Sequence, residues 1–167
     1  MGIRRMAGAA CALLAAAVLA GCAHPDLIDI STPETAVTAS LGEPDAKIAL
    51  PEGGSRLVYS LQPMAQEVWW ITLDRTGRVT AKENVLNREH FALIQPGVST
   101  EQDVWNLFGR CAQTYTFALK NEHAWMYRFL DEGMFHMACW VQFNTAGVVT
   151  EVGYTTDPWH DRDGDWS

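Results

Sequence analysis

The sequence predicts an α+β fold of two tandem repeats. Each is a short helix or helix pair followed by an antiparallel β-meander, with the helices packed on one face of the sheet. Two observations lead to this prediction. The segment LDRTGRV at 73–79 returns 70 positions later as FNTAGVV at 143–149. Each copy also carries a capped helix pattern followed by runs of alternating, β-branched and aromatic residues.

The two helices are predicted from their caps. In the first copy, Thr32 is the expected N-cap, and Gly42 follows the last apolar position, where a left-handed C-cap is favoured. In the second copy, Ser99 is the expected N-cap of a capping box completed by Gln102, and Gly109 ends the helix. Cap, apolar positions and glycine thus follow in the same order twice.

The strands are predicted from alternation and from the turns between them. The expected strands are 56–61, 67–73 and 78–84 in the first copy, and 114–119, 123–130, 137–143 and 148–154 in the second. Glycine at the turns 75–77, 145–147 and 131–133 allows positive φ, as tight hairpins require. We therefore assign the first repeat to 30–88 and the second to 89–157.

Composition limits the classes of function. The 167 residues carry a formal charge of −8, and 48% of them are hydrophobic. That apolar content suffices for a packed core, although each repeat alone is small for one. The acidic balance and the lack of any Lys/Arg run argue against a nucleic-acid partner, whose phosphates need basic patches.

The N-terminus has the pattern of a secretory signal peptide over residues 1–21. Arg4 and Arg5 form a positive region, and a short apolar run at 10–20 follows. That run is too short to cross a bilayer, which takes roughly 20 residues. The small residues Ala20 and Gly21 then precede Cys22. An ordinary signal peptide with a chance cysteine is the alternative interpretation.

The sequence LAGC at 19–22 resembles the lipobox of bacterial lipoproteins. The resemblance implies that the chain is cut before Cys22 and that this cysteine is acylated, which anchors the protein to a membrane. Two or more acyl chains anchor stably. By the same resemblance, Ala23 points to the outer membrane, on its periplasmic side. Residues 22–29 would then be a lipidated linker.

Cleavage before Cys22 removes two arginines and no acids, so the mature charge is −8 − 2 = −10. Cys22, Cys111 and Cys139 remain, and lipid would occupy the first. Because the envelope outside the cytoplasm is oxidising, we expect a disulfide between Cys111 and Cys139. Two free buried thiols are the alternative. A zinc site that adds His123 and His136 is less favoured, and we predict no metal site.

No motif of a known catalytic or nucleotide-binding site occurs in the chain. We therefore expect no enzyme activity, no cofactor and no small-molecule substrate. The tail at 158–167 is acidic, but it lacks the spacing of a calcium loop and is predicted to be disordered.

Aromatic residues are the candidate partner-binding groups. Alternation places Cys139, Val141 and Phe143 on one face of their strand, and Trp140 on the other. Aromatic side chains on an exposed sheet face are enriched at protein interfaces. The predicted partner-binding residues are Trp70, Trp140, Trp125 and Tyr127. In the alternative interpretation, the tryptophans pack under the helices.

Taken together, both copies resemble the SmpA/OmlA domain, the BamE-like family of small outer-membrane lipoproteins. The resemblance rests on TPETAVTASLGEP at 32–44, LVY at 57–59, WWITLDRTGRV at 69–79, PGVSTEQDVWNLFG at 96–109, WMY at 125–127 and CWVQFNTAGVV at 139–149. The tandem arrangement is similar to the β-lactamase inhibitor protein fold. The family implies a protein-binding module in envelope integrity or outer-membrane protein assembly. The inhibitor fold implies an inhibitor of an envelope or secreted hydrolase instead.

Overall fold

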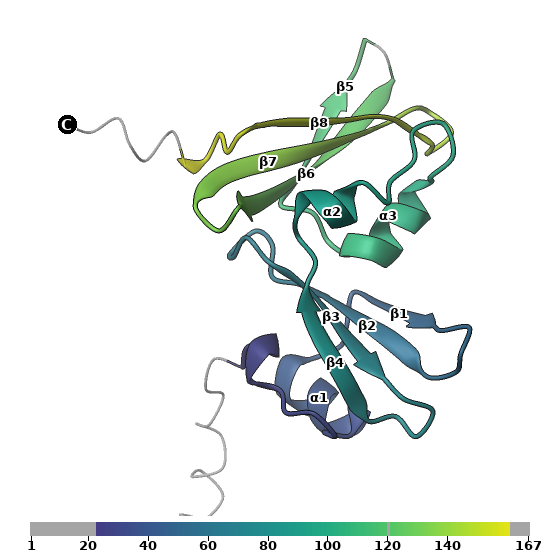
Figure 1. Ribbon diagram of the computed structural model, residues 1–167. Coiled ribbons are helices and arrows are strands. Elements are labelled where there is room, and N and C mark those ends of the chain that lie inside the picture. Colours follow the sequence, from purple (N-terminus) through teal and green to yellow (C-terminus); the bar gives the residue numbers. More distant parts are fainter. Residues whose placement is uncertain (1–22, 120, 161–167) are drawn as a thin grey trace, which may run out of the picture.

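The computed structural model describes residues 23–119 and 121–160 and shows a mixed α+β protein (Figure 1). Two four-stranded antiparallel sheets lie one above the other, and short helices lie between and below them. None of the helices in the described ranges combines the length and hydropathy needed to cross a membrane. We call residues 24–87 the N-terminal half and residues 88–160 the C-terminal half.

The N-terminal half opens with the 3₁₀ turn η1 (Pro25–Leu27) and the helix α1 (Glu34–Leu41). Its sheet has the order β1-β2-β3-β4. The strands are β1 (Ala46–Ala49), β2 (Ser55–Ser60), β3 (Val68–Leu73) and β4 (Val79–Asn84). The last three match the predicted strands, whereas β1 was not predicted, because its four residues are too few to show a pattern.

The C-terminal half opens with the helices α2 (Arg88–Phe91) and α3 (Glu101–Phe108). Its sheet has the order β5-β6-β7-β8. The strands are β5 (Gln113–Phe117), β6 (Glu122–Asp131), β7 (Phe135–Phe143) and β8 (Val149–Thr156). All four were predicted, as was the turn between β6 and β7, where Glu132 and Gly133 have positive φ.

The predicted N-caps were each wrong by one residue, whereas the predicted C-caps Gly42 and Gly109 are confirmed. Thr100, not Ser99, caps α3, in a capping box with Asp103. The Ser99 hydroxyl instead accepts the backbone N–H of Gln95 at 2.9 Å, so it is unavailable to the helix. In the N-terminal half, Pro33 occupies the N-cap of α1 without a side-chain hydrogen bond.

The two halves make several hydrogen bonds at matching positions. The Tyr59 hydroxyl donates to the carbonyl of Gly42 at 3.1 Å, and the Tyr127 hydroxyl donates to that of Gly109 at 2.9 Å. In each case a tyrosine of the second main strand holds the glycine that ends the preceding helix. Both glycines have positive φ, 83° and 60°, which explains the residue type.

The N-terminal sheet is covered on both faces. On one face, Leu57 and Ile71 pack in a cluster with Val37 of α1. On the other face, Val58 belongs to a larger cluster that includes Phe108 of α3. Helix α3 contacts both β1 and β2, although it precedes the C-terminal sheet in the chain. This helix therefore joins the two halves.

The C-terminal sheet has its helices on one side only (Figure 1). Its inner face packs against Phe91 of α2 and Phe108 of α3 through the buried residues Tyr127, Phe129, Cys139, Val141 and Phe143. We call the opposite face the open face. As the strand register shows, it carries the partly buried Trp140, Gln142 and Gly153 and also the buried Ala124, Met126 and Ala138.

The predicted disulfide between Cys111 and Cys139 was wrong, because both are free thiols in the structure. Cys111 lies just before β5, where the N–H of Ala112 bonds the carbonyl of Met126 on β6. Cys139 lies on β7, on the other side of β6. Two strand spacings are about 9.5 Å. A disulfide needs Cα atoms within about 7 Å.

Two predicted boundaries also differ from the structure. Pro25 and Ile28 are buried, so the body begins at His24 and not after a linker that ends at residue 29. At the other end, Trp159 and His160 pack on Arg128 and His136, inside the tail predicted to be disordered. Residues 161–167 of the tail, the signal peptide and Cys22 lie outside the described residues.

Candidate interaction site

The structure separates the four aromatic residues predicted to bind a partner. Tyr127 is fully buried in the core and bonds Gly109, so it offers no surface and we remove it from the candidate set. Trp125 is partly buried on the inner face, where its ring meets Phe143 at 4.8 Å between centroids. These two residues support the helices under the sheet.

Trp70 lies at the junction of the two halves. Its indole N–H donates to the carbonyl of Leu107 in α3 at 2.6 Å, and the guanidinium of Arg56 lies 3.6 Å from its ring centroid. The ring of His90 meets it edge-on at 5.0 Å. Helices α2 and α3 of the same chain therefore already cover Trp70.

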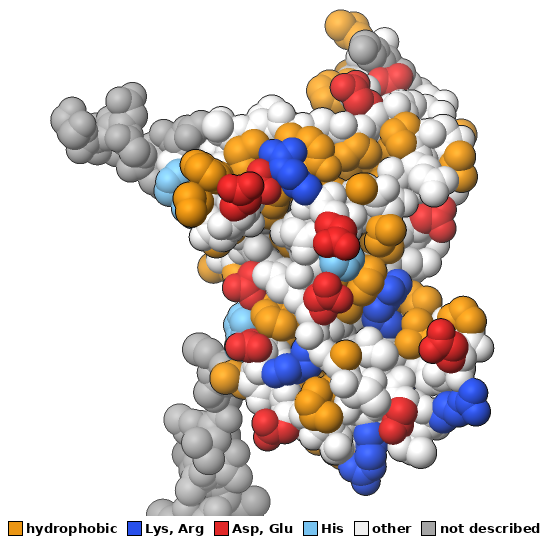
Figure 2. Space-filling model, in the orientation of Figure 1, with side chains coloured by type: hydrophobic (Ala, Val, Ile, Leu, Met, Phe, Trp, Pro, Cys, Tyr) orange, Lys and Arg blue, Asp and Glu red, His pale blue; other side chains and the backbone are white. Residues whose placement is uncertain are grey.

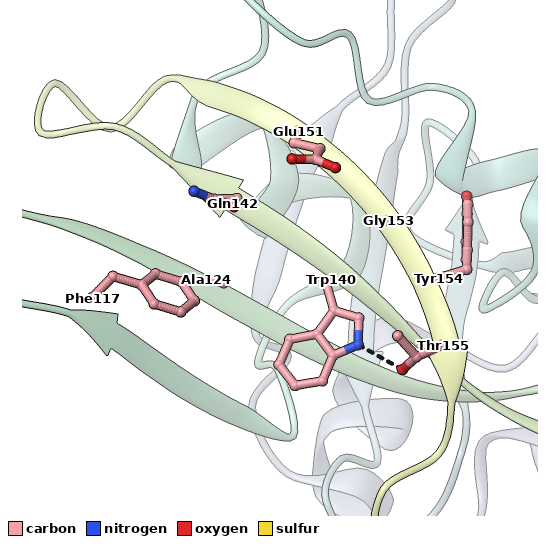
Figure 3. Close-up of a pocket in the computed structure, with 8 residues that line it drawn as sticks. All are labelled: Phe117, Ala124, Trp140, Gln142, Glu151, Gly153, Tyr154 and Thr155. Carbon is pink, nitrogen blue, oxygen red and sulfur yellow. Dashed lines mark hydrogen bonds between the residues drawn. The ribbon is translucent and has the colours of Figure 1, made fainter. Parts of the chain in front are cut away.

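Trp140 occupies the matching position on the C-terminal sheet, but no helix covers it. It lies on the open face, where its ring meets Tyr115 at 5.0 Å and its N–H donates to the hydroxyl of Thr155 at 2.9 Å (Figure 3). Of the four predicted aromatic residues, Trp140 is the one that the structure places on an open sheet face.

A hollow of about 360 Å³ lies beside Trp140. Gly153 pairs with Trp140 in the strand register, and a methyl group added there would meet no atom within 4 Å. Figure 3 shows the rings of Trp140 and Phe117 beside this gap, while Tyr154 points away from it. Glycine inside a strand weakens it and often marks a close approach of another molecule. Gly153 was not among the predicted site residues, although a glycine inside a predicted strand was a signal.

The hollow continues toward the β5–β6 hairpin as a second depression of about 340 Å³. There Phe117 is 42% exposed and Leu119 is fully exposed. Figure 2 shows a row of hydrophobic side chains over the C-terminal sheet, and charged side chains over both halves. The carboxylates of Glu122 and Glu151 border this region, and neither forms an ion pair with a described residue.

A buried ion pair fixes the far end of the open face. The guanidinium of Arg128 bonds the fully buried carboxylate of Asp157 at 2.8 Å. The amide of Gln62, from the loop after β2, donates to the carbonyl of Arg128 at 2.7 Å. Gln66 of the same loop also donates to Asp157. This network holds the two halves in one orientation.

The described residues show little that resembles a reactive centre. Burial raises the pKa of the Cys139 thiol far above its ordinary value and also raises the pKa of Cys111. Both thiols therefore stay protonated near neutral pH and are poor nucleophiles. Within residues 23–119 and 121–160, no three His, Cys, Asp or Glu side chains gather as a metal site would require.

Comparison with protein-family models, with curated proteins and with solved structures finds no match to this chain. The resemblance to the SmpA/OmlA family therefore stays a prediction from the sequence.

Proposed function

We propose that this protein is a lipoprotein anchored at Cys22 to the periplasmic side of the outer membrane, and that it binds another envelope protein in membrane-protein assembly or envelope integrity. The observation that carries the proposal is the order of basic residues, apolar run and LAGC at the N-terminus. A resemblance to the BamE-like family supports it. We also interpret the two halves as copies of one duplicated unit, because helix, turn and tyrosine contacts recur in the same order.

The open face is the proposed binding surface. In the N-terminal half, the matching face receives α3, and Trp70 donates to a carbonyl of that helix. The open face keeps the equivalent Trp140 but lacks such a cover among the described elements. A partner that lies on this face would bury Trp140 and the Gly153 hollow as α3 buries Trp70.

The first test is crosslinking in detergent-solubilised outer membranes with the native chain, and with Cys22→Ser as the control. Recovery of barrel-assembly components by the native chain alone is the expected result. An unacylated native chain, or recovery of the same proteins by both chains, would contradict an anchored role.

Surface variants then test the face itself. Trp140→Ala should weaken binding of the recovered partner by about 2 kcal/mol or more, as truncation of an interface hot spot does. Gly153→Val should also weaken it, because the new side chain fills the hollow without needing positive φ. Thr150→Val is a matched control on the same strand, outside the hollow. Unchanged affinity in both face variants would refute this surface.

A second candidate function is inhibition of an envelope or secreted hydrolase. Two four-stranded antiparallel sheets in one chain favour it, since they fit the predicted likeness to the β-lactamase inhibitor protein fold. An inhibitor should bind one soluble hydrolase with one-to-one stoichiometry and block it without the lipid. The Cys22→Ser chain tested against β-lactamase and lysozyme would therefore distinguish the two functions.

A further inference from the structure

The distance between the proposed anchor and the folded body is short. His24 is only two residues after Cys22, and its side chain is already fixed. Its Nδ1 accepts the N–H of Asp26 at 3.2 Å, and its Nε2 lies 3.1 Å from the carboxylate of Glu67. Its ring also meets Trp69 edge-on at 5.7 Å. Within the described residues, only Ala23 precedes this fixed side chain.

The next residues are held just as firmly. Pro25 is buried at the start of η1, and Ile28 packs in the cluster with Val37 and Ile71. The N–H of Ser31 then donates to the carbonyl of Val79 on β4 at 2.8 Å. The segment from His24 to Ser31 is therefore part of the rigid N-terminal half.

Two large apolar side chains of this segment point into solvent. Leu27 is 72% exposed and Ile30 is 56% exposed. They flank the buried Ile28, which fixes the backbone that carries them. The described chain begins here, beside η1 and α1, away from the C-terminal sheet (Figure 1).

Chain length decides what covers them. An extended chain spans at most about 3.6 Å per residue, so His24 lies within about 7 Å of the Cys22 Cα atom. The headgroup layer on each side of a bilayer is about 5 to 8 Å thick. Acyl chains on Cys22 would thus hold η1 at the level of the headgroups. Apolar side chains at that level insert roughly 5–10 Å toward the acyl chains.

We propose that Leu27 and Ile30 form a membrane-contact surface that inserts into a zwitterionic phospholipid layer beside the lipidated Cys22. Charge selects the lipid class, because this end of the molecule has no net positive charge that would attract anionic headgroups. The exposed carboxylates of Asp26 and Asp29 border the two residues. They are balanced by Lys82, whose ammonium lies 3.7 Å from the Asp26 carboxylate, and by Arg78, whose guanidinium donates to the carbonyl of Ser31. This surface rests on the proposed lipidation, and it would orient the open face of the C-terminal sheet away from the membrane.

Site-specific labels test the depth of insertion. The lipidated chain would carry Cys111→Ser and one added cysteine, Leu27→Cys, Ile30→Cys or Leu119→Cys, each labelled with a fluorophore. In phosphatidylcholine vesicles with a headgroup nitroxide, labels at 27 and 30 should be quenched, and the label at 119 should keep its emission. Equal, weak quenching at all three positions in an acylated chain would overturn the contact surface alone. A mass without acyl groups would refute the proposed function and this surface together.

Partition into vesicles measures how much Leu27 and Ile30 contribute to membrane binding. The chain from Cys22, carrying one acyl chain on the thiol, binds membranes only marginally, so further contributions are measurable. Replacing Leu27 and Ile30 together by Ser should lower vesicle partition about tenfold. Replacing Phe117 and Leu119 together by Ser removes a similar apolar area on the far half and should leave partition unchanged. Equal partition of both double variants would refute insertion.

Discussion

The N-terminal and C-terminal sheets differ in what covers them, although each has four antiparallel strands behind a helix. The N-terminal sheet is packed between α1 and α3. The C-terminal sheet packs against helices on one face, whereas its other face is covered only at one end, by the loop after β2. Trp70 and Trp140 occupy matching positions and both are partly buried, yet α3 covers Trp70 and no helix covers Trp140. The same residue at the same place in a meander therefore packs against a helix in one half and has no such cover in the other.

The difference arises from connectivity. Helix α3 covers a face of the N-terminal sheet and the inner face of its own sheet at once. No unit follows the C-terminal sheet within the described residues to repeat this arrangement. Four predictions, from the largest expected effect to the smallest, test this difference between the two halves.

The hydrogen-bond network around Arg128 and Asp157, where the halves meet, should have the largest effect on stability. Arg128→Met leaves the fully buried Asp157 carboxylate without its cation and should lower the free energy of unfolding by about 4 kcal/mol. Lys47→Met breaks the exposed pair with Glu34 in the N-terminal half and should cost less than about 1 kcal/mol. Urea denaturation of both variants measures the contrast, and similar losses would contradict it.

The two tryptophans should separate stability from binding. Trp70→Ala removes a side chain packed between the halves and should destabilise the fold by about 3 kcal/mol. Trp140→Ala should cost only about 1 kcal/mol, because its ring already meets solvent. Calorimetry of both variants checks this order. A larger loss for Trp140 would mean that the open face is part of the core.

The helix-ending glycines provide a finer comparison. Both Gly42 and Gly109 have positive φ, so alanine at either position is strained by about 1 kcal/mol. At Gly109, however, the added methyl would lie 2.7 Å from the Cβ of Asp45, whereas Gly42 faces open space. Gly109→Ala should therefore cost about 2 kcal/mol, roughly twice as much as Gly42→Ala. An equal loss of unfolding free energy in the two variants would show that Asp45 moves aside without cost.

Alkaline pH should reveal the smallest difference. Burial raises the pKa of Tyr59 to about 12 and also raises the pKa of Tyr127 well above its ordinary value of 10.0. The folded state thus keeps protons that the unfolded state loses above pH 10, so stability falls as pH rises. The slope is at most about 1.4 kcal/mol per pH unit for each fully buried group. Urea denaturation between pH 9 and 11 should therefore show a shallower slope for Tyr59→Phe and for Tyr127→Phe than for the parent chain. The same slope in all three chains would contradict protonated tyrosines in the folded state.

The sequence alone determined most of the fold. Seven strands, both helix-ending glycines and the face of Cys139, Val141 and Phe143 followed from alternation and turn residues, because these are local properties of the chain. The cap of α3 was misplaced because Ser99 bonds Gln95 across a turn that the capping pattern did not include. The predicted signal peptide and the predicted lipidation of Cys22 still rest on the sequence alone.

Only the tertiary structure decided which aromatic residues are exposed. Local pattern placed Trp70 and Trp140 alike, but α3 packs back onto β1 and β2 and covers Trp70 alone of the two. The same holds for Cys111 and Cys139, which β6 separates. The short path from Cys22 to the fold likewise appeared only once His24 and Ile28 were seen to pack. Burial and distance depend on contacts between residues far apart in the chain, and no local pattern encodes them.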